Sequence, residues 1–122
     1  MRSDFRFLRT RNGVTRFAAV TLTANDAEVW SVGIDASMAD AVDRHGDPLR
    51  DGVLIAAKAH ERLGGRRHSV VIEALEETVV DTSPDAVRCA AAMAAWKSFG
   101  RDESNAHISY GPNGWEIHFT AD

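Results

Sequence analysis

Residues 80–100 read VDTSPDAVRCAAAMAAWKSFG, and this stretch decides the fold class. Ser83 is a residue type that caps helix N-termini, and Pro84 has a fixed φ that suits the first helical position. Asp85 follows in the first turn, where the positive end of the helix dipole favours a carboxylate. Gly100 is a typical residue just past a helix C-terminus. The stretch therefore predicts an Ala-rich helix whose small side chains allow it to lie close to a sheet.

A second helix is predicted upstream of this one. Asp47 can cap it, Pro48 suits its first position, and Gly64-Gly65 ends it. Its apolar residues recur at steps of three and four, so they form one buried stripe. The members of this stripe are Leu49, Val53, Ala56, His60 and Leu63. Residues 37–47 are polar and are expected to form a loop.

Strand signals surround the two helices. Asn12-Gly13 between alternating apolar runs predicts a tight hairpin turn, and residues 30–34 alternate as a third strand. A fourth strand is predicted from Val70 to Val80, and residues 105–120 form a hairpin around 111–114. The order is β-β-β-α-β-α-β-β. We therefore expect an α+β fold: a single, mostly antiparallel sheet, two helices packed on one face, and hairpins at both termini.

The composition fits a single domain over residues 1–122, with hydrophobic residues at 44% and charged residues at 26%. No apolar run approaches the roughly 18 residues that cross a bilayer. The N-terminus also lacks the apolar segment of a secretory signal, so we expect a cytoplasmic location and no membrane partner. Cys89 is the only cysteine, which excludes an intramolecular disulfide.

Two segments carry a resemblance to a known family. Val80, Asp81, Thr82, Ser83 and Ala86 match the pattern H-x-V-D-S-S-x-x-A-F that leads into an Ala-rich helix. The upstream stretch LRDGVLIAAKAHERLGG is similar to the first helix of the same family. Residues 45–100 thus resemble the fourth domain of elongation factor G. The resemblance implies a left-handed β-α-β crossover, an exception to the usual right-handed rule.

The departures from that family limit what the resemblance implies about function. Thr78 stands where the family has its tip histidine, and Leu75 lies near its turn glycine. The sequence has no G-x-x-x-x-G-K-[ST] loop, so it is not a GTPase. The family's domain also ends near the second helix, whereas this chain adds a hairpin. The resemblance therefore implies the fold without the translocase role.

Positive charge is concentrated at the N-terminus, although the net charge is −4. Residues 1–20 hold five arginines against Asp4, a local +4, so the other 102 residues carry −8. Pairing through the Asn12-Gly13 turn places Arg9 opposite Arg16, with Arg11 diagonal on the same side. Opposed like charges are destabilising, and an anion between them relieves the repulsion. We therefore consider an anion or RNA-backbone site at these arginines, against three solvated arginines at an exposed tip.

The last hairpin offers a second candidate site. Its register places His107 opposite His118 and Ser109 opposite Glu116. His107, Glu116 and His118 have the ligand types that bind a transition metal. The alternative is the polar outer face of an amphipathic hairpin. His60 is expected to be a hydrogen-bonded core histidine.

No catalytic motif is found: G-x-S-x-G, H-E-x-x-H and G-x-G-x-x-G are all absent from the sequence. We therefore expect a non-catalytic domain without a cofactor, which acts through binding or self-association. The favoured partner is anionic: RNA, a ribosomal surface or an acidic protein surface. Exposed strand edges would also allow a homo-oligomer. The competing prediction is a small metal-binding protein or enzyme that uses the His/Glu face of the last hairpin.

Overall fold

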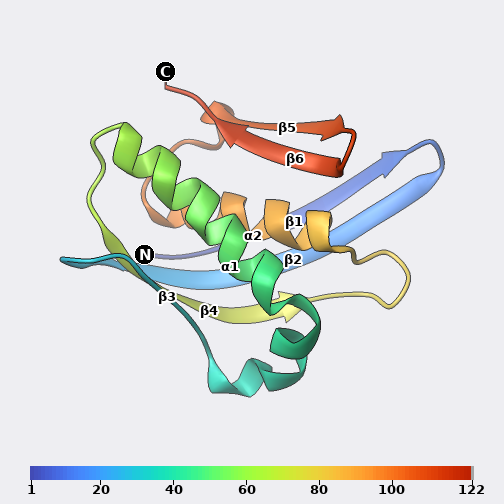
Figure 1. The fold of residues 1–122 in the computed structure, drawn as a ribbon, viewed down its shortest axis with the longest axis horizontal. Helices are drawn as coiled ribbons and strands as arrows, with labels where there is room; N and C mark the ends of the chain where they lie inside the picture. The colour runs from blue at the N-terminus through green and yellow to red at the C-terminus, as the bar shows by residue number, and fades with distance from the viewer. Residues whose placement is uncertain (122) are drawn as a thin grey trace.

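The computed structural model describes residues 1–121 as two α-helices, two short 3-10 turns and six strands (Figure 1). Within these residues no helix is both long enough and apolar enough to span a membrane. The strands and helices, in chain order, are β1 (Arg2–Arg11), β2 (Val14–Asp26), β3 (Ser31–Ile34), α1 (Ala39–Arg62), β4 (His68–Glu76), α2 (Pro84–Ser98), β5 (Ala106–Gly111) and β6 (Gly114–Phe119).

The main sheet has the strand order β1-β2-β4-β3. β1 pairs with β2 and β2 with β4 in antiparallel fashion, whereas β3 and β4 are parallel. α1 connects the two parallel strands and crosses on the near side of the sheet in Figure 1, which makes the crossover left-handed. The α+β fold with this unusual crossover is therefore confirmed.

The C-terminal hairpin β5–β6 forms a sheet of its own and does not extend the main one. It packs on the far side of α2 from the main sheet (Figure 1). Phe119 stacks on Trp96 of α2 with ring centroids 4.2 Å apart, and Ile117 is also buried. The hairpin joins α2 because it has an apolar face to cover, while β1 and β3 remain the edges of the main sheet over the described residues.

α2 is the centre of the core. Eleven of its fifteen residues are buried, as expected for a helix that is apolar on all sides. Its alanines allow α1 to approach closely, and Gly52 lies at the contact. A Cβ atom on Gly52 would lie 2.4 Å from the carbonyl oxygen of Arg88. The two helices therefore meet almost backbone to backbone.

α1 starts earlier than the sequence predicts. It begins at Ala39, so the expected cap at Asp47 and the expected loop over 37–47 are wrong. Pro48 lies inside the helix, where it removes one backbone hydrogen bond. The turns around it are held by packing, because His45 and Gly46 are buried. Tertiary burial thus outweighs the local preference of proline for a helix start.

β4 ends at Glu76, before the predicted end at Val80. Its pairing with β2 stops there, and Val79 and Val80 are exposed in the turn that leads to α2. The turn is attached to β2 at its far end: the Thr82 hydroxyl donates to the Phe17 carbonyl oxygen at 2.7 Å. The chain must reverse at this point to enter α2, so the valines cannot continue the strand.

Candidate functional site

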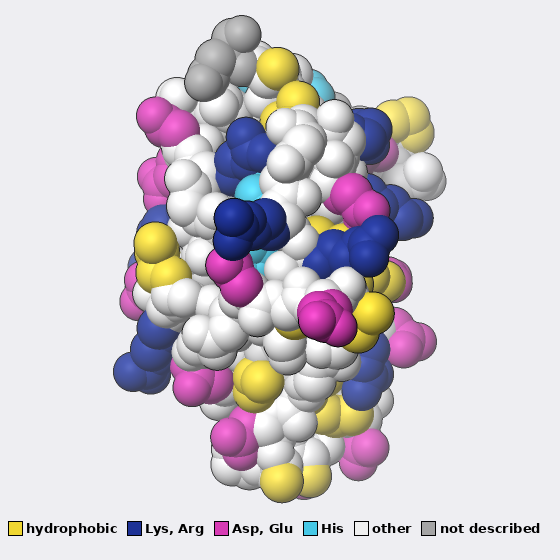
Figure 2. Space-filling view, turned by 90° about the vertical axis from the view of Figure 1, so that its left-hand side faces the viewer, with side chains coloured by type: hydrophobic (Ala, Val, Ile, Leu, Met, Phe, Trp, Pro, Cys, Tyr) yellow, Lys and Arg dark blue, Asp and Glu magenta, His cyan; other side chains and the backbone are white. Residues whose placement is uncertain are grey.

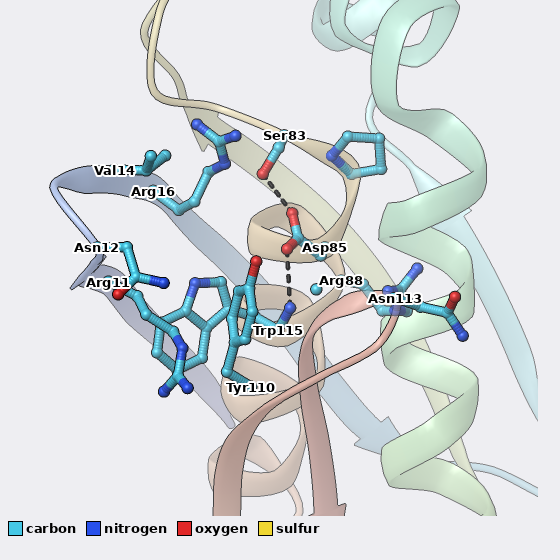
Figure 3. Close-up of a pocket in the computed structure, with 12 residues that line it drawn as sticks. Arg11, Asn12, Val14, Arg16, Ser83, Asp85, Arg88, Tyr110, Asn113 and Trp115 are labelled. Atoms are coloured by element: carbon cyan, nitrogen blue, oxygen red, sulfur yellow. Dashed lines mark hydrogen bonds between the residues drawn. The ribbon is translucent and has the colours of Figure 1, made fainter.

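A pocket of about 590 Å³ lies where three parts of the chain meet: the β1–β2 turn, the start of α2 and the β5–β6 turn (Figure 3). All three lie on the same side of the molecule in Figure 1. The lining residues are Arg11, Asn12, Val14, Arg16, Ser83, Pro84, Asp85, Arg88, Tyr110, Asn113, Gly114 and Trp115.

Strand alternation explains why arginines reach this pocket. Phe7 is buried, and Arg9 and Arg11 continue the same face of β1. The β1–β2 hairpin extends past the start of α2 in Figure 1, so these later positions have no helix above them. The predicted register is confirmed, with Arg9 opposite Arg16. Arg11 and Arg16 line the pocket, whereas Arg9 lies beside it on the strand.

Arg88 is a third lining arginine, and it was not among the predicted site residues. It comes from α2 and is half-buried. One feature of the sequence distinguishes Arg88: it is the single charged residue from Val87 to Trp96. That signal does not indicate a partner, because the helix and the first hairpin are separated by about seventy positions along the chain.

Asp85 connects α2 to the C-terminal hairpin. Its carboxylate accepts hydrogen bonds from the Ser83 hydroxyl, from the Ala86 amide at 3.0 Å and from the Trp115 amide at 2.8 Å. Burial raises the pKa of Asp85, but these hydrogen bonds outweigh burial and hold the pKa below its usual value. The predicted cap residue Ser83 is at the right position, although its hydroxyl bonds Asp85 and makes no side-chain cap bond.

Gly114 allows this connection. It has φ +98°, and a Cβ atom there would lie 2.4 Å from Asp85 Oδ2. A larger residue would displace the carboxylate and strain the turn. The glycine thus keeps both Asp85 oxygens occupied by protein donors.

The arginines around the pocket form no ion pair with the acidic residues that the structure describes. Within residues 1–121, no carboxylate forms an ion pair with Arg9, Arg11, Arg16 or Arg88. The opposite end of the molecule differs: basic and acidic side chains lie next to one another there (Figure 2). Pairs of this kind include Arg66 with Asp26 at 3.5 Å and Arg67 with Glu61 at 3.8 Å. The lining therefore holds three arginines and one carboxylate, that of Asp85.

Two aromatic side chains complete the pocket. The guanidinium carbon of Arg11 lies 4.6 Å from the centroid of the Tyr110 ring. Tyr110 meets Trp115 edge to face at 5.2 Å, and Trp115 meets buried Phe7 at 5.8 Å. Tyr110 and Trp115 lie far along the chain from Arg11, so the fold alone brings these groups together.

The outer face of the last hairpin has the predicted register. His107 and His118 are cross-strand partners with ring centroids 5.1 Å apart, and His107 Nε2 lies 3.0 Å from Thr120 Oγ1. Glu116 lies beside Gly111, where a Cβ atom would be 3.0 Å from its carboxylate. Among residues 1–121 no group of three His, Cys, Asp or Glu side chains is placed to hold a metal ion.

His60 and Cys89 lie in the core. His60 Nδ1 accepts a hydrogen bond from Arg101 Nε at 2.8 Å. Burial, together with the charge of Arg101, lowers the pKa of His60 to about 4, so the ring is neutral at physiological pH. Burial raises the pKa of the Cys89 thiol to about 12, which makes it a poor nucleophile. Both side chains are packed in the core, and their surroundings indicate a structural role.

Comparison with protein-family models gives no match, and comparison with curated proteins gives none. Thirty-five chains of solved structures are similar. One is the crystal structure of ttk003000868 from Thermus thermophilus, with a TM-score of 0.64 and 17% identity. The match covers 79% of this chain but 15% of that chain. At this identity the likeness establishes the fold alone, and the chain corresponds to a small part of that protein.

Proposed function

We propose that this domain is a non-catalytic binding module that holds an anionic partner, such as RNA, in the pocket at the start of α2. The observation that carries the proposal is the convergence of Arg11, Arg16 and Arg88 on one cavity without a carboxylate partner among the described residues. Arginine fits this role because its planar guanidinium binds phosphate through two parallel hydrogen bonds.

The hydrogen-bonding inventory of the pocket supports an anionic ligand. Each guanidinium carries five donors and no acceptor. The carboxylate of Asp85 already accepts from Ser83, Ala86 and Trp115. Arg16 makes one long bond to the Thr15 carbonyl at 3.4 Å. The three guanidinium groups therefore hold donors that phosphate oxygens could accept from.

The charge distribution supports the same proposal. The first twenty residues carry +4, while the remainder of the chain carries −8. Arg2 and Arg6 pair with Glu73 and Glu76, so the arginines of this segment without an ion pair are the three near the β1–β2 turn. An anionic partner would be attracted to that end of the molecule. Such binding weakens as salt rises, because counterions screen the charges and compete for the site.

A titration with inorganic tripolyphosphate, followed by amide and indole NMR shifts, tests the proposal. We expect shifts at Ala86, at the Trp115 indole and in the β1–β2 turn, and their loss in the double variant Arg16→Glu/Arg88→Glu. Arg50→Glu/Arg62→Glu is the matched control, because it makes the same charge change on exposed α1 positions. Equal loss in both double variants, or shifts away from the pocket, would contradict the proposal.

We further propose that residues 45–100 correspond to the fourth domain of elongation factor G. The left-handed crossover through α1 and the fold-level likeness to a much longer chain support this relationship. Thr78, at the family's histidine position, closes its own turn: its hydroxyl accepts from the Asp81 amide at 3.0 Å. The binding pocket is instead built largely by the two terminal hairpins, so the proposed activity is separate from the translocase role.

A further inference from the structure

The pocket combines arginines with an aromatic surface, which a simple phosphate site does not require. We infer that the anionic partner is a single-stranded nucleic acid and that the pocket takes one unpaired nucleotide. Its base would lie on the Tyr110–Arg11 pair, and its phosphate would meet Arg16 and Arg88. This inference rests on the proposed function, because it names the class of anion that the same arginines bind.

The Tyr110–Arg11 pair is suited to stacking. Tyr110 is 49% exposed, and the Arg11 guanidinium lies over its ring in a cation–π contact at 4.6 Å. Unstacked bases lie on aromatic rings and on guanidinium planes in single-strand complexes. Trp115 contacts Tyr110 edge to face, and its ring centroid lies 5.8 Å from that of buried Phe7. Trp115 thus connects the pair to the core.

The arginines lie on two sides of this surface. Figure 3 shows Arg16 and Ser83 on one side of the pocket and Arg11 with Tyr110 and Trp115 on the other. A nucleotide has the same two parts, a planar base and an anionic phosphate joined by a sugar. The amides of Asn12 and Asn113 at the rim offer both donors and acceptors for a base edge or a sugar hydroxyl.

A single strand fits the pocket better than a duplex. The bases of a duplex are stacked inside the helix, so the exposed ring of Tyr110 would have nothing to contact. A cavity of about 590 Å³ has room for a splayed nucleotide, whereas a rigid duplex meets a concave site poorly.

Fluorescence anisotropy with labelled oligouridine and oligothymidine of about twelve nucleotides, a length one small binding module covers, tests the inference. We expect both single strands to bind at least about tenfold more tightly than RNA and DNA duplexes of equal length. Tyr110→Ala should weaken single-strand binding by about tenfold, the loss expected for one stacked base. Tyr110→Phe should retain it.

His118→Ala is the matched control, because it removes an exposed ring from the opposite face of the same hairpin. Circular dichroism establishes that each variant folds. The tighter binding of oligouridine or of oligothymidine identifies RNA or DNA as the preferred ligand, and either result supports the inference.

Three results would overturn the inference while leaving the anion site intact: duplexes that bind as tightly as single strands, Tyr110→Ala that binds like the unaltered protein, or an oligo-aspartate peptide that binds more tightly than both strands. Tripolyphosphate binding that survives Arg16→Glu/Arg88→Glu would instead refute the proposed function itself.

Discussion

Gly52→Ala should destabilise the protein, although alanine is the better helix former. Gly52 lies inside α1 against α2, and an added Cβ atom would lie 2.4 Å from the Arg88 carbonyl oxygen. The same atom would lie 2.8 Å from Ala91 Cβ and 3.0 Å from the Ala92 amide nitrogen. Two of the three contacts are with backbone atoms, which cannot rotate away. The helices would have to separate.

Two opposing effects set the magnitude. Replacing glycine by alanine within a helix stabilises by about 0.5–1 kcal/mol. Overpacking a close contact costs about 1–3 kcal/mol, and a backbone clash lies at the upper end of that range. The net expectation is a loss of about 2 kcal/mol in the free energy of unfolding, with a Tm lower by about 8 °C for a domain of this size.

Urea unfolding monitored by circular dichroism measures this effect. Gly46→Ala is the control, because it lies in the same helix and its Cβ atom would meet side-chain atoms alone and at longer distances, Val42 Cγ1 at 3.2 Å and Arg50 Nη1 at 3.3 Å. We expect this control to stay within about 1 kcal/mol of the unaltered protein. The reasoning fails if Gly52→Ala is as stable as the control, because α1 and α2 would then not meet as closely as described.

Three further predictions concern titration and hydrogen bonding. His60 has a folded-state pKa of about 4 against an ordinary value of 6.5, so the unfolded chain takes up the proton first. Stability should therefore be complete above about pH 6.5 and decline as the pH falls toward 4, and His60→Gln should flatten this decline in urea midpoints. Cys89 should react with Ellman's reagent only at the rate of global unfolding, because its thiol is buried and its pKa is about 12; fast labelling under native conditions would exclude the buried position. Asp85→Ala removes three hydrogen bonds worth about 1 kcal/mol each, so it should lower the free energy of unfolding by about 2–3 kcal/mol. An unchanged urea midpoint would show that the carboxylate does not hold the hairpin to α2.

Local sequence signals were sufficient for both hairpin registers. The Asn12-Gly13 turn and the alternation around it place Arg9 opposite Arg16, and the same reasoning places His107 opposite His118. Such predictions succeed because a side chain's position on a strand depends on its distance from the turn, which is a short-range property. The strand–helix order and the α+β class follow from the same kind of signal.

The sequence-based predictions were wrong where the local preference of a residue conflicts with tertiary packing. Pro48 is a good first residue of a helix, yet the burial of His45 and Gly46 extends α1 back to Ala39. Val79 and Val80 have strand propensity, yet β4 ends at Glu76 because the chain must turn into α2. In α1 the tertiary contacts outweigh a cost of about 3 kcal/mol for proline in a helix interior. At the end of β4 they outweigh strand preferences that span about 1 kcal/mol.

The sequence by itself therefore determined the elements, the two registers and a basic N-terminal hairpin. Only the tertiary structure decided that Arg88, Tyr110 and Trp115 join that hairpin around one pocket. The contributing segments lie on α2 and on β5–β6, far along the chain from β1. These segments meet because α2 is apolar on all sides and the C-terminal hairpin covers the side of α2 that faces away from the main sheet. No rule that acts over a few residues contains that information.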